Sequence, residues 1–401
     1  MDVVDGVRVT GPLAPYARGF ADELARLGFT GLSASGQLRL AAHLSRWLAG
    51  AGLGTAALGG PVTDQYLVGR RASGYTAYLT PKALRPLLDY LRRLGVVPEP
   101  EQRWPATAAE VLLEAYREYL LGERGVQAVV ARGYVGLVRP FVAHYAGSSI
   151  AGLGLVGAGD VTAFLTVQSR RLAPKTAQRL ATALRSLLRF WHLQGLTGED
   201  LSKAVPKIAN RRAALPRPLE PGQVHALLAS CDRQSAGDRR DLAMLMLLAR
   251  MGLRAGEVAG LRLDDIDWRH GQITIRGKGN RRDQLPLPTD VGEAVVAYLR
   301  DGRPVTALDR SVFIRTKAPH RGLTTGGVTQ AVAAAARRAG LGTIYAHRLR
   351  HSAATAMLAG GGSLAEVGQV LRHRRPHTTA AYTKVNIEAL RALARPWPGA
   401  S

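Results

Sequence analysis

Cysteine is almost absent from this chain of 401 residues, in which Cys231 stands alone. A single cysteine forms no disulfide within the chain and no cysteine-based zinc site, so we expect a reducing compartment. Long apolar runs are missing as well, because no stretch reaches the ~18 apolar residues that span a bilayer. Residues 1–5 (MDVVD) carry acid where a secretory signal needs basic residues. These absences predict a cytoplasmic protein without a membrane partner.

Acidic residues are scarce relative to basic ones. The chain has 30 Asp and Glu against 54 Lys and Arg, a formal net charge of +24. Such an excess favours a polyanionic partner, and most of it is Arg, whose fork-shaped head suits phosphate. A GC-rich genome that inflates Arg, Ala, Gly and Leu is the alternative interpretation. We predict a nucleic acid as the partner.

Two proline-rich breaks, at 97–105 and 211–221, divide the sequence. Proline removes a backbone donor and pushes the preceding residue out of helical geometry, so these stretches read as linkers. A chain of this length is also too long for one ordinary core. We therefore predict three domains, at residues 1–97, 105–210 and 216–401.

The first two segments resemble each other. Residues 83–90 (ALRPLLDY) recur at 183–190 (ALRSLLRF), and Gly95 and Gly195 keep the same offset. This similarity predicts two copies of one helical unit. The first copy is the less basic, since Asp89 stands where the second has Arg189.

In the second copy, a leucine stripe that ends at Trp191 predicts the buried face of a helix. Basic side chains off that stripe are candidates for contacts with the DNA backbone, although a solvated surface would explain each of them. They are Arg170, Arg171, Lys175, Arg179, Arg185 and Arg189.

The third segment predicts helices around a small hairpin. Residues 242–251 form an apolar run long enough for a buried helix, which Gly252 can terminate. Residues 273–276 and 284–287 read as two strands on either side of a Gly/Asn turn, and helical patterns follow. The expected fold class is mainly α with a small antiparallel β-sheet in the third segment.

On a helix, His347, Arg350 and His351 would lie at i, i+3 and i+4 and present two imidazoles and a guanidinium together. The two histidines also have zinc-binding spacing, but Arg348 stands where such a site needs Glu, and Arg350 shares the face. We predict no metal there. An anion suits this face better.

Two further motifs carry weaker signals. The glycine-rich turn at Gly277 lacks the spacing of an ATP-binding loop and connects two strands. Its Lys278 either dips toward a bound phosphate or is incidental to the turn. The carboxylates Asp264, Asp265 and Asp267 suggest two-metal chemistry, but a capped or solvated turn explains them better.

Taken together, six residues in this order resemble the tyrosine recombinases, the integrase family of phages and transposons. The motifs are the GLRAGE box, the GKGNRR hairpin, the HRLRH box, the LRH motif and the tyrosine segment at 379–383. The resemblance implies a catalytic set of Arg254, Lys278, His347, Arg350, His373 and Tyr382.

The resemblance implies supporting roles for Glu257 and His351, and makes Arg281 and Arg282 candidates for DNA contact. It also implies a multi-domain architecture, in which the second segment is the usual helical DNA-binding domain and the first is extra. One departure is Arg372, where the family usually has Gly, and we expect it to perturb the turn before His373.

The implied reaction is site-specific cutting and rejoining of DNA, in which Tyr382 forms a 3′-phosphotyrosyl bond. Arg254, Arg350 and His373 would stabilise the phosphate, His347 would accept or organise the phenol proton, and Lys278 would protonate the leaving oxygen. Neither ATP nor metal nor another cofactor is expected. A homotetramer on double-stranded DNA and a nucleoid-associated bacterial protein are implied, while accessory proteins stay unknown.

Two alternatives remain. A type IB topoisomerase would use the same chemistry to relax one duplex, and a DNA-binding protein of the same fold would have lost catalysis. The helix expected at 386–394 would dock on a neighbouring protomer or on its own domain.

Overall fold

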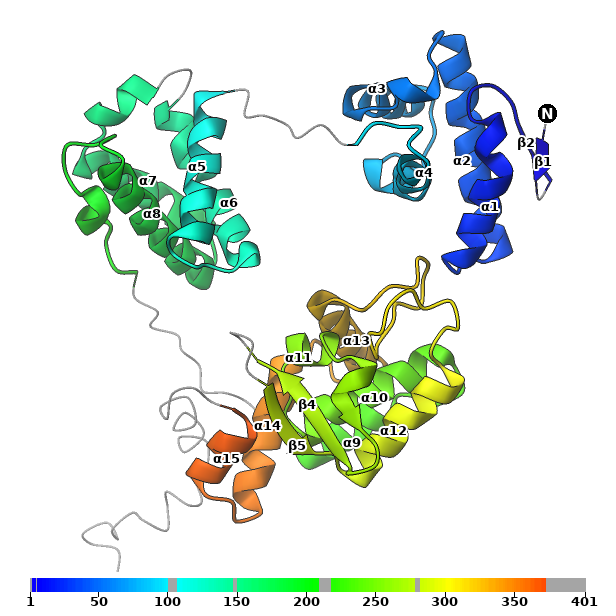
Figure 1. The fold of residues 1–401 in the computed structure, drawn as a ribbon. Coiled ribbons are helices and arrows are strands. Elements are labelled where there is room, and N and C mark those ends of the chain that lie inside the picture. The colour runs from blue at the N-terminus through cyan, green and yellow to red at the C-terminus, as the bar shows by residue number, and fades with distance from the viewer. Residues whose placement is uncertain are drawn as a thin grey trace, which may run out of the picture. The chain divides into compact units, whose positions relative to one another are not determined.

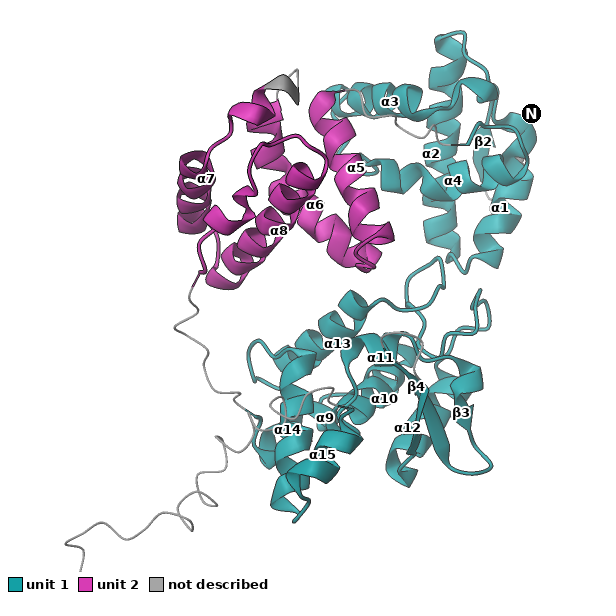
Figure 2. Cartoon of the chain, turned by 60° about the vertical axis from the view of Figure 1, so that its left-hand side comes forward, with its two compact units in different colours: residues 1–100, 215–401 teal, residues 101–214 magenta. Residues whose placement is uncertain are grey.

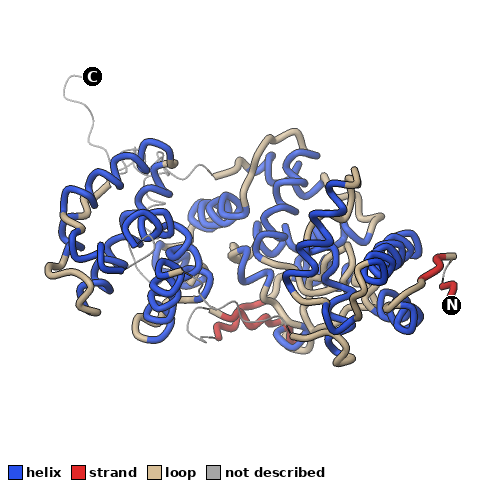
Figure 3. Tube along the Cα trace, turned by 90° about the horizontal axis from the view of Figure 1, so that it is seen from above, coloured by secondary structure: helices blue, strands red, loops and turns tan. Residues whose placement is uncertain are grey.

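The computed structural model describes residues 2–4, 6–99, 107–146, 150–208, 218–277 and 282–372. Helices dominate these residues, and strands are few and short (Figures 1 and 3). The expected class, mainly α with a small antiparallel sheet, is therefore confirmed. None of the helices described is at once long and apolar enough to cross a membrane.

The first segment combines a short hairpin with helices (Figure 1). Sequence patterns had not predicted its hairpin of β1 and β2, which pair antiparallel. Its buried side chains gather around Phe20, Leu44 and Tyr66. The elements are β1 (Asp2–Val4), β2 (Val7–Val9), η1 (Ala14–Tyr16), α1 (Ala17–Arg26), α2 (Gly31–Gly50), η2 (Thr55–Ala57), α3 (Gly60–Ala72) and α4 (Pro81–Arg93).

The second segment is helical and has its own core, in which Trp191 is fully buried beside Phe141. The predicted leucine stripe of α8 forms part of this core. The elements are α5 (Ala108–Gly122), α6 (Ala128–Ala146), η3 (Ile150–Leu155), α7 (Ala158–Arg171), α8 (Pro174–Leu193) and η4 (Leu201–Ala204).

The ends of α4 and α8 have the same local structure, as the sequence similarity predicts. Gly95 and Gly195 follow these helices with φ of 69° and 68°, in the left-handed region that favours glycine. Leu84 and Leu184 are both buried. Helix α8 is longer at its start, so the two copies differ there.

The third segment packs helices around α10, which contacts α9, α11, α12, α13 and α14. Ser235 begins α10 by accepting a hydrogen bond from the backbone N–H of Asp238 at 3.0 Å. The apolar run from Leu242 then fills the core. The helices are α9 (Pro221–Ala229), α10 (Ala236–Arg250), α11 (Ala255–Ala259), η5 (Leu263–Asp265), α12 (Thr289–Asp301), α13 (Thr325–Arg338), α14 (Ala346–Ala359) and α15 (Leu364–Val370).

One antiparallel sheet of order β3-β4-β5 belongs to this segment. Its strands are β3 (Ile266–Asp267), β4 (Gln272–Arg276) and β5 (Arg282–Pro286), and Ile273 lies opposite Leu285. The predicted hairpin is thus confirmed, with strand ends shifted by one or two residues.

Contacts along the chain separate residues 101–214 as one unit and group 1–100 with 215–401 as the other (Figure 2). The buried residues of 7–97 and of 219–349 nevertheless form different clusters. The division into three domains stays a prediction.

Candidate active site

A turn at Gly252, after α10, precedes Arg254, the first arginine of the predicted site. Gly252 has φ of 61°, as expected for the residue that ends this helix. A β-carbon at this position would lie 2.5 Å from Cδ2 of Leu371, so the turn has no room for a side chain. Arg254 follows as the N-cap of α11.

The Arg254 side chain is 46% exposed and is paired with a more deeply buried carboxylate. Its Nη1 donates to Oε1 of Glu257 at 2.7 Å, and its backbone N–H donates to Oε2 at 2.8 Å. Burial opposes ionisation of Glu257. The N–H of Arg254 and the charge of Arg372 outweigh burial and lower the pKa of the carboxyl.

Helix α14 carries the predicted trio on one face, and Arg350 lies at its buried edge. Arg350 is 2% exposed. Its Nη1 donates to the carbonyl of Gly252 and its Nη2 to the carbonyl of Leu371. These two bonds join the turn before Arg254 to the segment that enters His373.

The two histidines of α14 are in contact, with ring centroids 4.3 Å apart in an edge-to-face arrangement. His347 is exposed and His351 is partly buried. Burial, helped by the nearby His347 and Arg350, lowers the pKa of His351 to about 4. His351 is therefore neutral at pH 7 and cannot serve as a second cation beside Arg350.

Several predicted residues lie outside those that the structure describes. They are Lys278, Arg281, His373 and Tyr382, together with the helix expected at 386–394. Arg282 is described and is exposed at the start of β5. The site as seen thus consists of Arg254, Glu257 and the α14 face.

The basic side chains proposed for DNA contact lie on α7 and α8. Arg170, Arg171, Lys175, Arg179 and Arg189 are exposed. Arg185 is partly buried instead, and its guanidinium binds the carbonyls of Val205 and Pro206 at distances between 2.8 and 3.3 Å. Within the second segment, Arg185 therefore holds the chain that follows η4.

Arg372 is the residue that sequence reasoning undervalued. Its backbone has φ of 54°, and its side chain is only 9% exposed. Its Nη2 donates to Oε2 of Glu257 at 2.6 Å. The one signal in the sequence was a charged residue at a position that favours glycine.

The acidic turn is capped and paired, as the better of its two interpretations predicts. Asp265 accepts from the backbone N–H of Arg262 and from Arg276, while Asp264 pairs with Arg310. Among the residues that the structure describes, no cluster of His, Cys, Asp or Glu could hold a metal ion.

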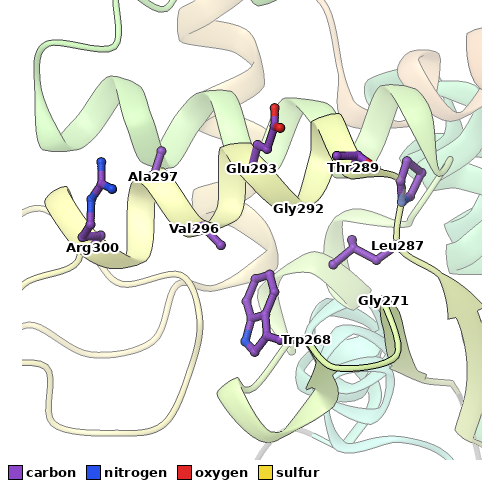
Figure 4. Close-up of a pocket in the computed structure, with 10 residues that line it drawn as sticks. Trp268, Gly271, Leu287, Thr289, Gly292, Glu293, Val296, Ala297 and Arg300 are labelled. Atoms are coloured by element: carbon purple, nitrogen blue, oxygen red, sulfur yellow. The ribbon is translucent and has the colours of Figure 1, made fainter.

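The third segment contains a pocket. It is lined by Trp268 and by the face of α12 that includes Glu293 and Val296 (Figure 4). None of the predicted site residues that the structure describes is among the residues that line it.

The fold and these motifs define a class, the tyrosine site-specific recombinases. The chain belongs to the phage integrase family, whose family model matches residues 217–389. It is 40% identical over 397 residues to the integrase/recombinase y4rA of Sinorhizobium fredii, an alignment that covers 97% of this chain and 95% of that protein. It is 35% identical over 306 residues to the tyrosine recombinase XerD of Mycobacterium tuberculosis, covering 72% of this chain and 96% of the relative.

Solved structures show a similar fold. The XerH recombinase bound to palindromic difH substrate aligns with a TM-score of 0.57 and 19% identity, over 75% of this chain and 99% of that one. A λ integrase dimer bound to a core site aligns with a TM-score of 0.54 and 15% identity, over 72% and 96%.

Proposed function

We propose that this recombinase cuts and rejoins double-stranded DNA at specific sites through a covalent 3′-phosphotyrosyl intermediate. One observation carries the proposal: Arg350 binds the carbonyls of Gly252 and Leu371. It thereby joins three motifs that the sequence separates, those of Arg254, Arg350 and His373. The overall charge of +24 supports a DNA partner.

The arginines stabilise the charge that develops in the reaction. A phosphodiester carries one negative charge, and attack by an oxygen adds a second on the nonbridging oxygens. Arg254, exposed at the N-terminus of α11, contacts the phosphate, and Arg350 contributes a positive charge held at a fixed depth. His373 donates a further hydrogen bond. Catalysis of phosphoryl transfer depends almost entirely on such positioning and on stabilisation of charge.

Tyr382 is the nucleophile. Its phenol oxygen forms the bond to phosphorus while the bond from phosphorus to the 5′ oxygen breaks. The phenol, with an ordinary pKa of ~10, loses its proton to His347, and Lys278 protonates the departing 5′ oxygen. A second 5′ hydroxyl reverses the step. The phosphotyrosine keeps the energy of the broken bond, so the cycle consumes no ATP and uses no metal.

Exchange of strands between two DNA sites needs four such centres. We therefore infer a homotetramer on DNA, an arrangement for which a λ integrase tetramer bound to a Holliday junction is a precedent in a related fold. Arg170, Arg171, Lys175, Arg179 and Arg189 are exposed and suit contacts with the DNA backbone.

A nicked suicide substrate tests the proposal. Because the target sequence is unknown, the duplex is first enriched from a random pool by binding to the full chain. The nick is then moved one nucleotide at a time. Wild type is expected to form a protein–DNA adduct that resists denaturation, and Tyr382→Phe is expected to bind the duplex without forming one.

Two results would contradict the proposal. Binding without any adduct at any nick position would favour a DNA-binding protein without catalysis. An adduct accompanied by relaxation of supercoiled DNA, with no exchange between two sites, would favour a type IB topoisomerase.

A further inference from the structure

Arg372 occupies an unfavourable backbone conformation. With φ of 54° it lies in the left-handed region, which only a few residues other than glycine adopt in the part of the chain that is described. Such strain persists only where the surroundings hold the residue in place. The side chain of Arg372 supplies the contacts that do so.

The guanidinium of Arg372 is buried and paired. Its Nη2 lies 2.6 Å from Oε2 of Glu257, and its Nη1 donates to the carbonyl of Val370 at 3.1 Å. The side chains of Arg372 and Glu257 are 9% and 7% exposed. Little of this guanidinium is therefore accessible to DNA in this conformation.

Glu257 is shared between two arginines. Its Oε2 accepts from Arg372 and from the backbone N–H of Arg254, and its Oε1 accepts from Nη1 of Arg254. Arg372 thus uses Oε2, the oxygen through which Glu257 could otherwise bind a second nitrogen of the Arg254 guanidinium. A guanidinium bound through one nitrogen keeps donors available for a phosphate, which it binds best in a bidentate manner.

The Nε atom of Arg372 lies near the hairpin of β4 and β5. Its Nε lies 3.9 Å from Oδ2 of Asp283 in β5, too far for a hydrogen bond, and is buried without a hydrogen-bond partner. Strand β5 follows directly after residues 278–281, which include Lys278. Arg372 therefore joins α11 to the segment that enters His373, and it lies within ion-pair distance of the start of β5.

We propose that Arg372 is a positioning residue of the recombination site, which holds Glu257 so that Arg254 keeps its fork directed at the DNA phosphate. This inference rests on the proposed function. The inference gives a role to Arg372, which would otherwise be regarded as a neutral replacement of the glycine that the family usually has there.

The test uses Arg372→Asn and Arg372→Gly in the full chain. Both substitutes accept a left-handed backbone, and both remove the guanidinium. In single-turnover cleavage of the enriched nicked duplex, we expect the rate constant to fall about fivefold to tenfold, in the range of measured couplings between contacting residues. DNA affinity and the unfolding temperature should change little, because the backbone strain is relieved as the pair is lost.

A pH profile separates positioning from a structural role. Without the cation of Arg372, the pKa of Glu257 should rise, so the acid limb of the cleavage rate should move to higher pH. When an Arg372 substitution is combined with Glu257→Gln, the cleavage rate should fall by much less than the product of the two single reductions.

The chain offers a matched control. Glu23 also lies between two arginines, Arg26 and Arg93, each at 2.7 Å, and its side chain is 9% exposed. Arg93→Asn should leave the cleavage rate and its pH profile unchanged.

Three results would overturn the inference. Wild-type cleavage rates in both Arg372 variants would do so and leave the proposed function standing. A fall in rate fully explained by lost DNA affinity or lost folded protein would do so too. No adduct with wild type would remove both the proposed function and this inference.

Discussion

Two arginines of the candidate site are held in opposite ways. Arg350 is 2% exposed, and its described hydrogen bonds go to the neutral carbonyls of Gly252 and Leu371. The Arg254 side chain is 46% exposed and binds the carboxylate of Glu257. Two carbonyls from separate segments hold the guanidinium of Arg350 in place, whereas a carboxylate of the same short helix binds that of Arg254. The buried arginine is therefore a fixed part of the framework, and the exposed one is the better placed to contact a ligand.

Because the two arginines are held differently, their variants should differ in how they affect stability and activity. Variants of Arg350 should damage both, because its guanidinium joins two segments of the chain. Variants of Arg254 should damage activity alone, because α11 and Glu257 remain held by other contacts, including Arg372.

The largest effect is expected for Arg350→Ala. Loss of the guanidinium leaves two buried carbonyls without these donors, at about 1–3 kcal/mol each, and removes a charge from the site. Both the free energy of unfolding, from denaturant titration, and the cleavage rate should fall. Arg350→Lys, which keeps the charge without the fork, should recover only part of either. A fully stable Arg350→Ala protein would contradict the framework role.

Arg254→Ala should lower cleavage on the order of 10²–10³-fold, as loss of one preorganised donor does elsewhere. The free energy of unfolding should stay within about 0.5 kcal/mol of wild type, as for an exposed side chain. Single-turnover rates and denaturant titration on the same preparation measure both quantities. Equal losses of stability in the Arg254 and Arg350 variants would remove the distinction between them.

Gly252→Ala tests the turn that connects the two arginines. Gly271 has the same φ of 61° but nothing within 4 Å of an added β-carbon, so Gly271→Ala is a matched control. The control should cost about 1–2 kcal/mol for the left-handed backbone. Gly252→Ala should cost about 1–3 kcal/mol more, because its β-carbon would overlap Leu371. Equal losses of unfolding free energy would show that this contact relaxes easily.

The smallest effect concerns His351, whose pKa is lowered to about 4 from 6.5. Between these values the unfolded chain binds a proton that the folded chain does not, so stability falls as pH decreases from 6.5 and levels off below 4. His351→Gln should flatten part of this dependence, measured as unfolding free energy at pH 7 and pH 5. An unchanged slope would mean that His351 titrates normally in the folded protein.

Local patterns predicted the elements that carry the site, because each pattern reflects a periodicity or a turn. The spacing of His347 and His351 gave one helix face, and the Gly/Asn turn gave the hairpin of β4 and β5. Helix α10 begins earlier than its apolar run, because the cap at Ser235 and a polar first turn escape a hydrophobic pattern.

The burial of individual side chains and the contacts between residues distant in sequence could not be predicted in this way. Periodicity places Arg350 on a face, but its burial depends on the carbonyls of Gly252 and Leu371, which are distant in sequence. The pairing of Arg372 with Glu257 likewise depends on a left-handed backbone that its residue type disfavours. The roles of Lys278, His373 and Tyr382 remain predictions from the sequence.

The most direct test of the account identifies the residue that becomes joined to DNA. The adduct from a suicide substrate is digested with nuclease and protease, and the peptide that keeps a nucleotide is sequenced by mass spectrometry. The account predicts a 3′-phosphate ester on Tyr382. A nucleotide on any other residue, or a 5′-phosphate linkage, would contradict it.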